Sequence, residues 1–220
     1  MESKRISLPP EKGYDKAYEL AYKLAGEHLA KTVDIEEQCR KSGTELRVKD
    51  SQKFVVVQYL NSPYLIGVPD GAMSAADSHE EVPIRDKLLI IHYFNTAKGT
   101  PPTNRLITFR ELPEGNVYFP TFTKRTIRPI VDNFGQQPQI LTTIGERLGG
   151  YKVDYGDAAV TIPAFRRVPV TLILWRGDEE LPPQGNVIFD ANIPDYLPTE
   201  DITVLCETIT WRLVRYFREK

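Results

Sequence analysis

Acidic side chains that could hold a divalent cation gather in the last third of the chain. They are Asp178, Glu179, Asp190 and Asp201. Carboxylate oxygens are the ligands that Ca²⁺ and Mg²⁺ prefer in proteins, so one hypothesis is a divalent-metal-dependent enzyme built on this set. Residues 178–180 are three adjacent carboxylates without the alternating spacing of a loop that wraps an ion. For that segment the favoured interpretation is a solvated hairpin tip.

A second set of residues suits a planar anionic ligand. His92 lies within an apolar run, where an imidazole could be the axial ligand of a haem or corrinoid metal, although a hydrogen-bonded core histidine is the commoner case. Basic side chains follow or precede aromatic ones in the middle of the chain, and guanidinium groups beside aromatic faces suit carboxylate-bearing ring systems. These candidate ligand residues are Arg110, Lys124, Arg125 and Arg128. A surface helix with extended basic side chains is the competing interpretation.

Composition narrows the function classes. The formal net charge is −2 and the basic residues are spread along the chain, which disfavours nucleic-acid binding. No run of about 18 apolar residues predicts a membrane span, and no apolar segment near the start predicts a signal peptide. Cys39 and Cys206 lack partners at metal-ligand or redox spacing, so we expect two buried thiols and a cytoplasmic protein. Common hydrolase and nucleotide-binding motifs are absent.

Hydrophobic periodicity predicts the elements that must position these residues. Apolar residues at helical spacing predict a helix over 14–31, and a β-branched run broken by Asn61-Ser62-Pro63 predicts two strands, 54–60 and 64–68. Further predicted strands cover 106–110, 151–155, 158–163, 169–176 and 186–191. Further predicted helices begin at Pro83, cover 122–134 and 138–148, and begin again after Pro198.

Two short phrases recur. Pro83-x-x-Asp86 and Pro198-x-x-Asp201 each open an apolar run, with an offset of 198−83 = 115. Proline suits the first helical turn, and an aspartate there can accept hydrogen bonds from free backbone N–H groups, so both aspartates are interpreted as helix-capping residues. The phrase Leu-Pro-x-Gly-Asn-Val-x-Phe at 112–119 recurs with one inserted residue at 181–189. Because its offset differs, a duplicated hairpin-helix unit and coincidental reuse of a common junction both stay open.

The C-terminal half, with Gly156-Asp157, Gly177-Asp178-Glu179-Glu180-Leu181-Pro182 and Leu197-Pro198-Thr199-Glu200-Asp201, resembles an uncharacterised domain family of anaerobic bacteria and archaea. Leu89-Ile90-Ile91-His92-Tyr93-Phe94 resembles the same family. In that family the domain is sometimes fused to an iron–sulfur-binding module of the kind found with corrinoid proteins. The resemblance therefore implies anaerobic cofactor metabolism, with an iron–sulfur or corrinoid protein as the expected partner. Two isolated cysteines cannot hold a four-cysteine cluster in this chain.

Together these observations predict an α+β fold in which antiparallel β-hairpins pack with helices, with two pseudo-repeated hairpin-helix units as one arrangement of it. The chain is predicted to be a single domain over 1–220, with potential lobes at 14–100 and 101–220. The preferred function is a non-catalytic binding or accessory module that holds a tetrapyrrole or a partner protein. The alternatives are the divalent-metal enzyme and a purely structural interaction domain.

Overall fold

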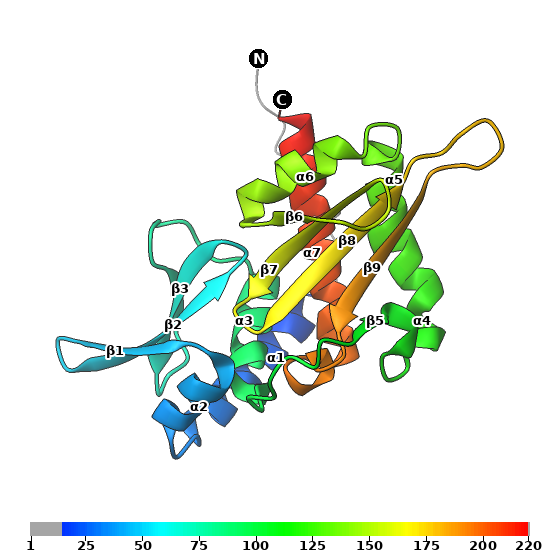
Figure 1. The fold of residues 1–220 in the computed structure, drawn as a ribbon. Coiled ribbons are helices and arrows are strands. Elements are labelled where there is room, and N and C mark those ends of the chain that lie inside the picture. Colours follow the sequence, from blue (N-terminus) through cyan, green and yellow to red (C-terminus); the bar gives the residue numbers. More distant parts are fainter. Residues whose placement is uncertain (1–14, 220) are drawn as a thin grey trace.

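The computed structural model describes residues 15–219 and has the predicted α+β architecture (Figure 1). The α-helices are α1 (Asp15–Ala30), α2 (Ile35–Ser42), α3 (Ile84–Thr96), α4 (Gly115–Phe122), α5 (Arg128–Phe134), α6 (Gln139–Gly145) and α7 (Thr199–Arg218). The strands are β1 (Glu45–Lys49), β2 (Gln52–Tyr59), β3 (Ser62–Val68), β4 (Met73–Ala75), β5 (Leu106–Thr108), β6 (Tyr151–Val153), β7 (Ala158–Phe165), β8 (Val168–Trp175) and β9 (Gln184–Asp190).

All strand pairs in the described part of the chain are antiparallel. The main path of the sheet runs β4-β3-β2-β7-β8-β9-β5, with β1 beside β2 and β6 beside β7. The element order is similar in the two halves: β1, β2 and β3 are followed by α3, and β7, β8 and β9 are followed by α7. Whether this order records a duplication stays a prediction.

The two halves of the sheet meet at a single residue pair. Tyr59 at the end of β2 is the register partner of Phe165 at the end of β7. Their rings stack with centroids 4.9 Å apart, and the Tyr93 ring of α3 also stacks on Phe165, with centroids 4.1 Å apart. All three side chains are buried, and one continuous hydrophobic cluster runs through both halves. This aromatic joint fixes where α3 lies relative to the sheet.

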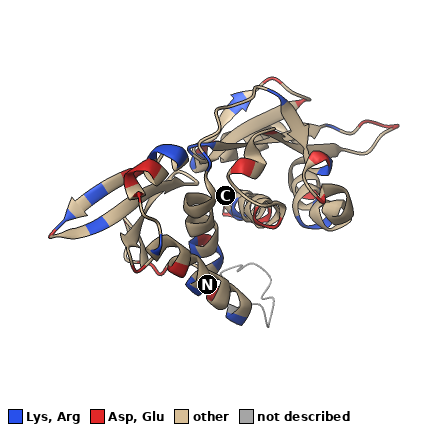
Figure 2. Ribbon diagram, turned by 90° about the horizontal axis from the view of Figure 1, so that it is seen from below, with Lys and Arg blue, Asp and Glu red and all other residues tan. Residues whose placement is uncertain are grey.

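Helices cover one face of the second half of the sheet. Figures 1 and 2 show α5, α6 and α7 on the same side of β7, β8 and β9, and no described helix lies on the opposite side. Figure 2 also shows acidic and basic residues interspersed over both halves. None of the described helices combines the length and the apolar character that crossing a membrane requires.

Most predicted elements are present close to their predicted bounds. One prediction was wrong at its start: the helix expected over 122–134 begins at Gly115 and continues through a π-helical turn, Thr123–Ile127, into α5. Phe122, the last residue of α4, is buried, and its ring stacks on Phe109 with centroids 3.8 Å apart. This contact packs α4 against the core. Burial of a large aromatic side chain outweighs the unfavourable proline at position 120 inside α4.

The two recurring phrases behave differently. Pro83 and Pro198 are the N-caps of α3 and α7, and Asp86 and Asp201 lie in the first turns, as predicted. The phrase at 112–119 enters α4, whereas its second copy at 181–189 enters β9. The second phrase is therefore not the mark of a repeated structural unit.

Candidate functional site

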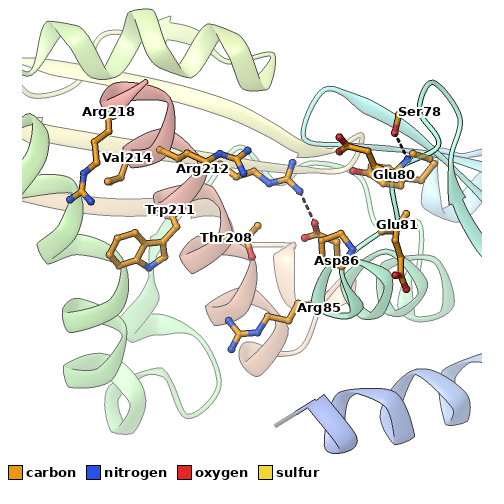
Figure 3. A pocket seen from close by; sticks show the side chains of 15 residues that line it. Ser78, Glu80, Glu81, Arg85, Asp86, Thr208, Trp211, Arg212, Val214 and Arg218 are labelled. Atoms are coloured by element: carbon orange, nitrogen blue, oxygen red, sulfur yellow. Dashed lines mark hydrogen bonds and ion pairs between the residues drawn. The ribbon is translucent and has the colours of Figure 1, made fainter. Parts of the chain in front are cut away.

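A pocket of about 510 Å³ opens between α7 and the segment that precedes α3. Figure 3 shows Arg212 of α7 reaching across it to Asp86 of α3, with Trp211 and Thr208 on the same helix. The opposite wall is formed by Ser78 and residues 80–83, and Tyr64 of β3 contributes an aromatic side chain. The pocket thus lies where the starting turn of α3 meets the later turns of α7.

A buried network forms the floor of this pocket. Asp86 Oδ1 accepts a hydrogen bond of 2.9 Å from the Tyr59 hydroxyl, and Asp86 Oδ2 pairs with Arg212 Nη2 at 2.7 Å. The Asp86 side chain is 7% exposed and that of Arg212 is 20% exposed. The aromatic joint of the sheet supplies Tyr59, so the same packing that connects the two halves also positions Asp86.

The network changes the proton affinities of its members. Burial raises the pKa of Tyr59 well above its usual value, and the neighbouring Asp86 carboxyl raises it further. Burial alone lowers the pKa of Arg212, but Asp86, Tyr59 and Tyr64 reverse this effect and hold it above its usual value. Arg212 is therefore a permanent cation whose charge one carboxylate already balances.

Further arginines surround this balanced pair. Arg85, Arg215 and Arg218 line the pocket, and the Trp211 indole, which is partly buried, adds an aromatic surface. Arg215 and Arg218 are exposed. Arg215 makes a 3.8 Å pair with Glu219 and lies over the Tyr216 ring, and Arg218 donates a 3.4 Å hydrogen bond to Asn133 Oδ1. The acidic lining beyond Asp86 is Glu80 and Glu81, of which Glu81 pairs with Lys87 at 3.6 Å. Cationic and aromatic groups of this kind suit an anionic ligand with a flat body.

The structure brings together two residues that the sequence assigned to different hypotheses. His92 Nδ1 lies 2.7 Å from Asp201 Oδ2, with side chains 28% and 11% exposed. A carboxylate that accepts from one ring nitrogen orients the imidazole and leaves the other nitrogen for a ligand or a proton. His92 does not line the large pocket. The pair links the start of α7 to α3, as Asp86 and Arg212 link the start of α3 to α7.

The capping role expected for the two aspartates was wrong. Neither α3 nor α7 has a side-chain hydrogen bond at its cap. Asp86 and Asp201 instead reach residues of the other helix and of β2. Each carboxylate still lies near the positive end of its own helix dipole, which is a favourable position for an acidic side chain.

The predicted basic residues lie outside the pocket. Arg110 covers the Phe119 ring, with its guanidinium carbon 3.7 Å from the ring centroid. Arg125 lies 3.8 Å from Glu207 of α7, and Lys124 and Arg128 are exposed. None of these four residues lines the pocket.

The predicted metal ligands do not converge. Asp178 and Asp190 lie at opposite ends of the β8–β9 hairpin, separated by about 20 Å of extended strand. Hydrogen bonds from the N–H groups of Leu181 and Glu180 lower the pKa of Asp178, as in a hairpin tip, and Glu179 is exposed beside it. Asp201 is paired with His92 on another part of the fold. Residues 15–219 contain no group of three or more His, Cys, Asp or Glu side chains placed to hold a metal ion.

Sequence reasoning missed the residues that line the pocket from α7. Trp211, Arg215 and Arg218 follow one another at helical i, i+4 and i+7 spacing near the end of the last helix. This stripe of one aromatic and two basic residues is the signal that could have marked the site. It was hidden because arginine near a helix C-terminus is also the usual complement of the helix dipole.

The fold and the pocket together define an α+β protein with an arginine-lined cavity between two antiparallel helices. A family model described as a domain of unknown function (DUF3786) matches residues 34–212, and the chain belongs to this family. The expected membership of an uncharacterised family is thus confirmed. The matched segment contains Asp86 and Arg212, whereas Arg215 and Arg218 follow it. No curated protein and no solved structure matches the chain.

Proposed function

We propose that this protein is a non-catalytic binding module whose pocket between α3 and α7 holds a flat, anionic ligand. The observation that carries the proposal is the set of side chains that converges there. Trp211 and Tyr64 offer aromatic surfaces, while Arg215 and Arg218 offer exposed guanidinium groups beside the internally balanced Asp86–Arg212 pair. Ligand pockets of roughly 300–1,000 Å³ with a few convergent polar groups are typical small-molecule sites.

A tetrapyrrole is the first ligand to test. Its ring is flat and apolar and its edge carries carboxylates, which fits an arginine-lined pocket. The proposed setting is anaerobic corrinoid or iron–sulfur cofactor metabolism, with a partner protein that supplies any cluster; this part of the proposal rests on the family resemblance. Because His92 does not line the pocket, binding there should not depend on an axial imidazole from that residue.

The competing functions have less support. An enzyme that uses a divalent metal would need Asp178, Glu179, Asp190 and Asp201 to lie together. Asp178 and Glu179 are neighbours at the hairpin tip, whereas Asp190 and Asp201 each lie on another part of the fold. A purely structural interaction domain would have no need of several arginines around one cavity.

The experiment uses the pocket tryptophan as a reporter. The chain has two tryptophans, and Trp175 is 40% exposed at the end of β8, so the variant Trp175→Phe leaves Trp211 alone. This variant is purified anaerobically and titrated with protoporphyrin IX, its neutral dimethyl ester, and haem. We expect quenching of Trp211 fluorescence by the free acid and by haem, and at least about tenfold weaker binding of the ester, because it lacks the charges that arginine recognises.

Matched arginine variants test where the ligand lies. The double variant Arg215→Gln with Arg218→Gln should weaken binding of the acid at least about thirtyfold, since two lost charge-assisted hydrogen bonds, each worth over about 1 kcal/mol, total over about 2 kcal/mol. Arg40→Gln is the control, because Arg40 is exposed on α2 and away from the pocket. Equal binding of acid and ester, or equal binding by all variants, would overturn the proposal. His92→Ala should leave the affinity for protoporphyrin unchanged.

A further inference from the structure

A second pocket, of about 380 Å³, lies on the sheet face opposite the helices. Its floor is Thr161 of β7 and Thr171 of β8, whose hydroxyls bond each other at 2.8 Å. Tyr151 of β6 and Leu106 of β5 stand on either side, and Arg167 in the turn between β7 and β8 closes one end. This pocket shares no lining residue with the pocket between α3 and α7.

Arg167 is a half-buried cation without a carboxylate partner. Among residues 15–219, no acidic side chain lies within ion-pair distance of its guanidinium group. Its Nε is buried and has no hydrogen-bond partner. Removing an arginine from water without a compensating charge is costly, so such a residue at the end of a pocket fits an anion that arrives from outside.

The carboxylate that lines the same pocket, Asp190, already accepts several hydrogen bonds from the protein. Asp190 is 9% exposed and accepts hydrogen bonds from the backbone N–H groups of Thr103, Asn104 and Asn192 and from the Thr103 hydroxyl, at 2.8–3.1 Å. Burial alone would raise its pKa, but these bonds lower it below the usual value. Asp190 therefore fixes residues 103–104 against the end of β9 and forms no ion pair with Arg167.

The remaining lining indicates the body of the ligand. Tyr151 and Tyr155 are 56% and 44% exposed and form part of the wall together with Pro102 and Pro169. Asn192 is 5% exposed, and its Oδ1 is buried without a hydrogen-bond partner. We propose that this pocket binds a small molecule with one oxyanion group, a carboxylate or a phosphate, held by Arg167, and an apolar ring or chain that lies against the tyrosine and proline side chains.

The test is an NMR titration of the full ¹⁵N-labelled chain with benzoate, phenyl phosphate and neutral benzamide. We expect one or both anions to shift amide signals of β6, β7 and β8 and the turn at residue 167, and benzamide to leave them in place. Benzoate and phenyl phosphate distinguish a planar from a tetrahedral oxyanion. If neither anion moves these signals at millimolar concentration, or if benzamide moves them equally, the proposal is overturned.

Two arginine variants distinguish specific binding of the anion by Arg167 from non-specific attraction of anions to nearby positive charge. Arg167→Gln should weaken the better probe about tenfold, the loss expected for a charge-assisted hydrogen bond. Arg166→Gln is the matched control, because Arg166 is the exposed neighbour in the same turn and does not line the pocket. Equal losses in both variants would refute a specific role for Arg167. Should Arg167→Gln fail to fold, Tyr155→Ala decides instead: weaker binding of phenyl phosphate supports the site, and unchanged binding overturns it.

Discussion

Helices α3 and α7 begin alike, and their first-turn aspartates have different surroundings. Each helix follows antiparallel strands, has a proline at its N-cap, and carries a buried aspartate in its first turn. Asp86 meets a fully buried tyrosine and an arginine, whereas Asp201 meets the partly exposed imidazole of His92. The difference teaches that the partner side chain, and not the helix start, decides whether such a carboxylate supports the fold or orients a group that solvent can reach.

In each of the two contacts, the first turn of one helix binds a later turn of the other. The start of α3 holds Arg212 of α7, and the start of α7 holds His92 of α3, so the helices run antiparallel with a polar link near each end. Thr208 lies between these links on α7, and Arg85 directly precedes Asp86 in the first turn of α3; both residues line the large pocket. The links therefore set the relative position of the two helices that form the proposed binding site.

The largest expected loss of folding stability follows from removal of the Asp86 carboxylate. Asp86→Ala leaves Arg212 mostly buried without its ion-pair partner, and removal of one member of a buried pair costs about 3 kcal/mol or more. Urea unfolding followed by circular dichroism measures the loss. Asp201→Ala is the matched variant at the other helix start and should cost only about 1 kcal/mol, because His92 keeps access to water. Equal losses of stability in the two variants would contradict the difference between the two helix starts.

Double-mutant cycles sharpen the same contrast. In the Asp86→Ala and Arg212→Ala cycle, we expect a coupling free energy of about 2 kcal/mol, because either single change leaves a charge desolvated. The Asp201→Ala and His92→Ala cycle should give about 0.5 kcal/mol, as is usual for pairs near solvent. Free energies of unfolding for the six proteins and the wild type supply both values. A larger coupling at the α7 start would reverse the assignment of the structural pair.

Alkaline pH should reduce the stability that the Tyr59–Asp86 contact gives the start of α3, and it should leave the contact at the start of α7 unchanged. Burial and Asp86 raise the pKa of Tyr59 in the folded protein, whereas the unfolded chain ionises it near about 10. The stability that this group contributes is complete below that unfolded pKa and falls as the pH rises above it. Tyr59→Phe should cost about 1 kcal/mol near neutral pH and flatten the decline. Urea unfolding between about pH 8 and about pH 11 measures the slope. Asp201→Ala should keep the wild-type slope.

Elements with a strong local pattern could be predicted from the sequence. The strands on either side of Asn61-Ser62-Pro63, the apolar helix after Pro83 and the final helix after Pro198 all form where hydrophobic period and breaker residues place them. The helix at 115–122 could not be placed this way. Its Gly-Asn-Val-x-Phe letters occur again in β9, so the local sequence permits both states and packing decides.

None of the residues selected as ligand-binding or metal-binding lines the candidate pocket, because its contacts join residues far apart in the chain. His92 and Asp201 were each selected from their residue type, but their contact spans 109 positions. The partners of Asp86 lie 27 and 126 positions away, in β2 and α7. Helical spacing shows which residues share a face of one helix, but it does not say which helix packs against that face.

The smallest expected effect concerns the imidazole of His92. A carboxylate oxygen accepts a hydrogen bond, so Asp201 should hold the proton of neutral His92 on Nδ1 and leave Nε2 as the acceptor. Long-range ¹H–¹⁵N NMR spectra at about pH 9, where histidine is usually neutral, report the tautomer. Asp201→Ala should shift His92 toward the Nε2–H form that free imidazole side chains favour. A wild-type protein already in that form would show that Asp201 does not orient the ring. The α7 start would then be only a structural contact, weaker than the one at α3 but of the same kind.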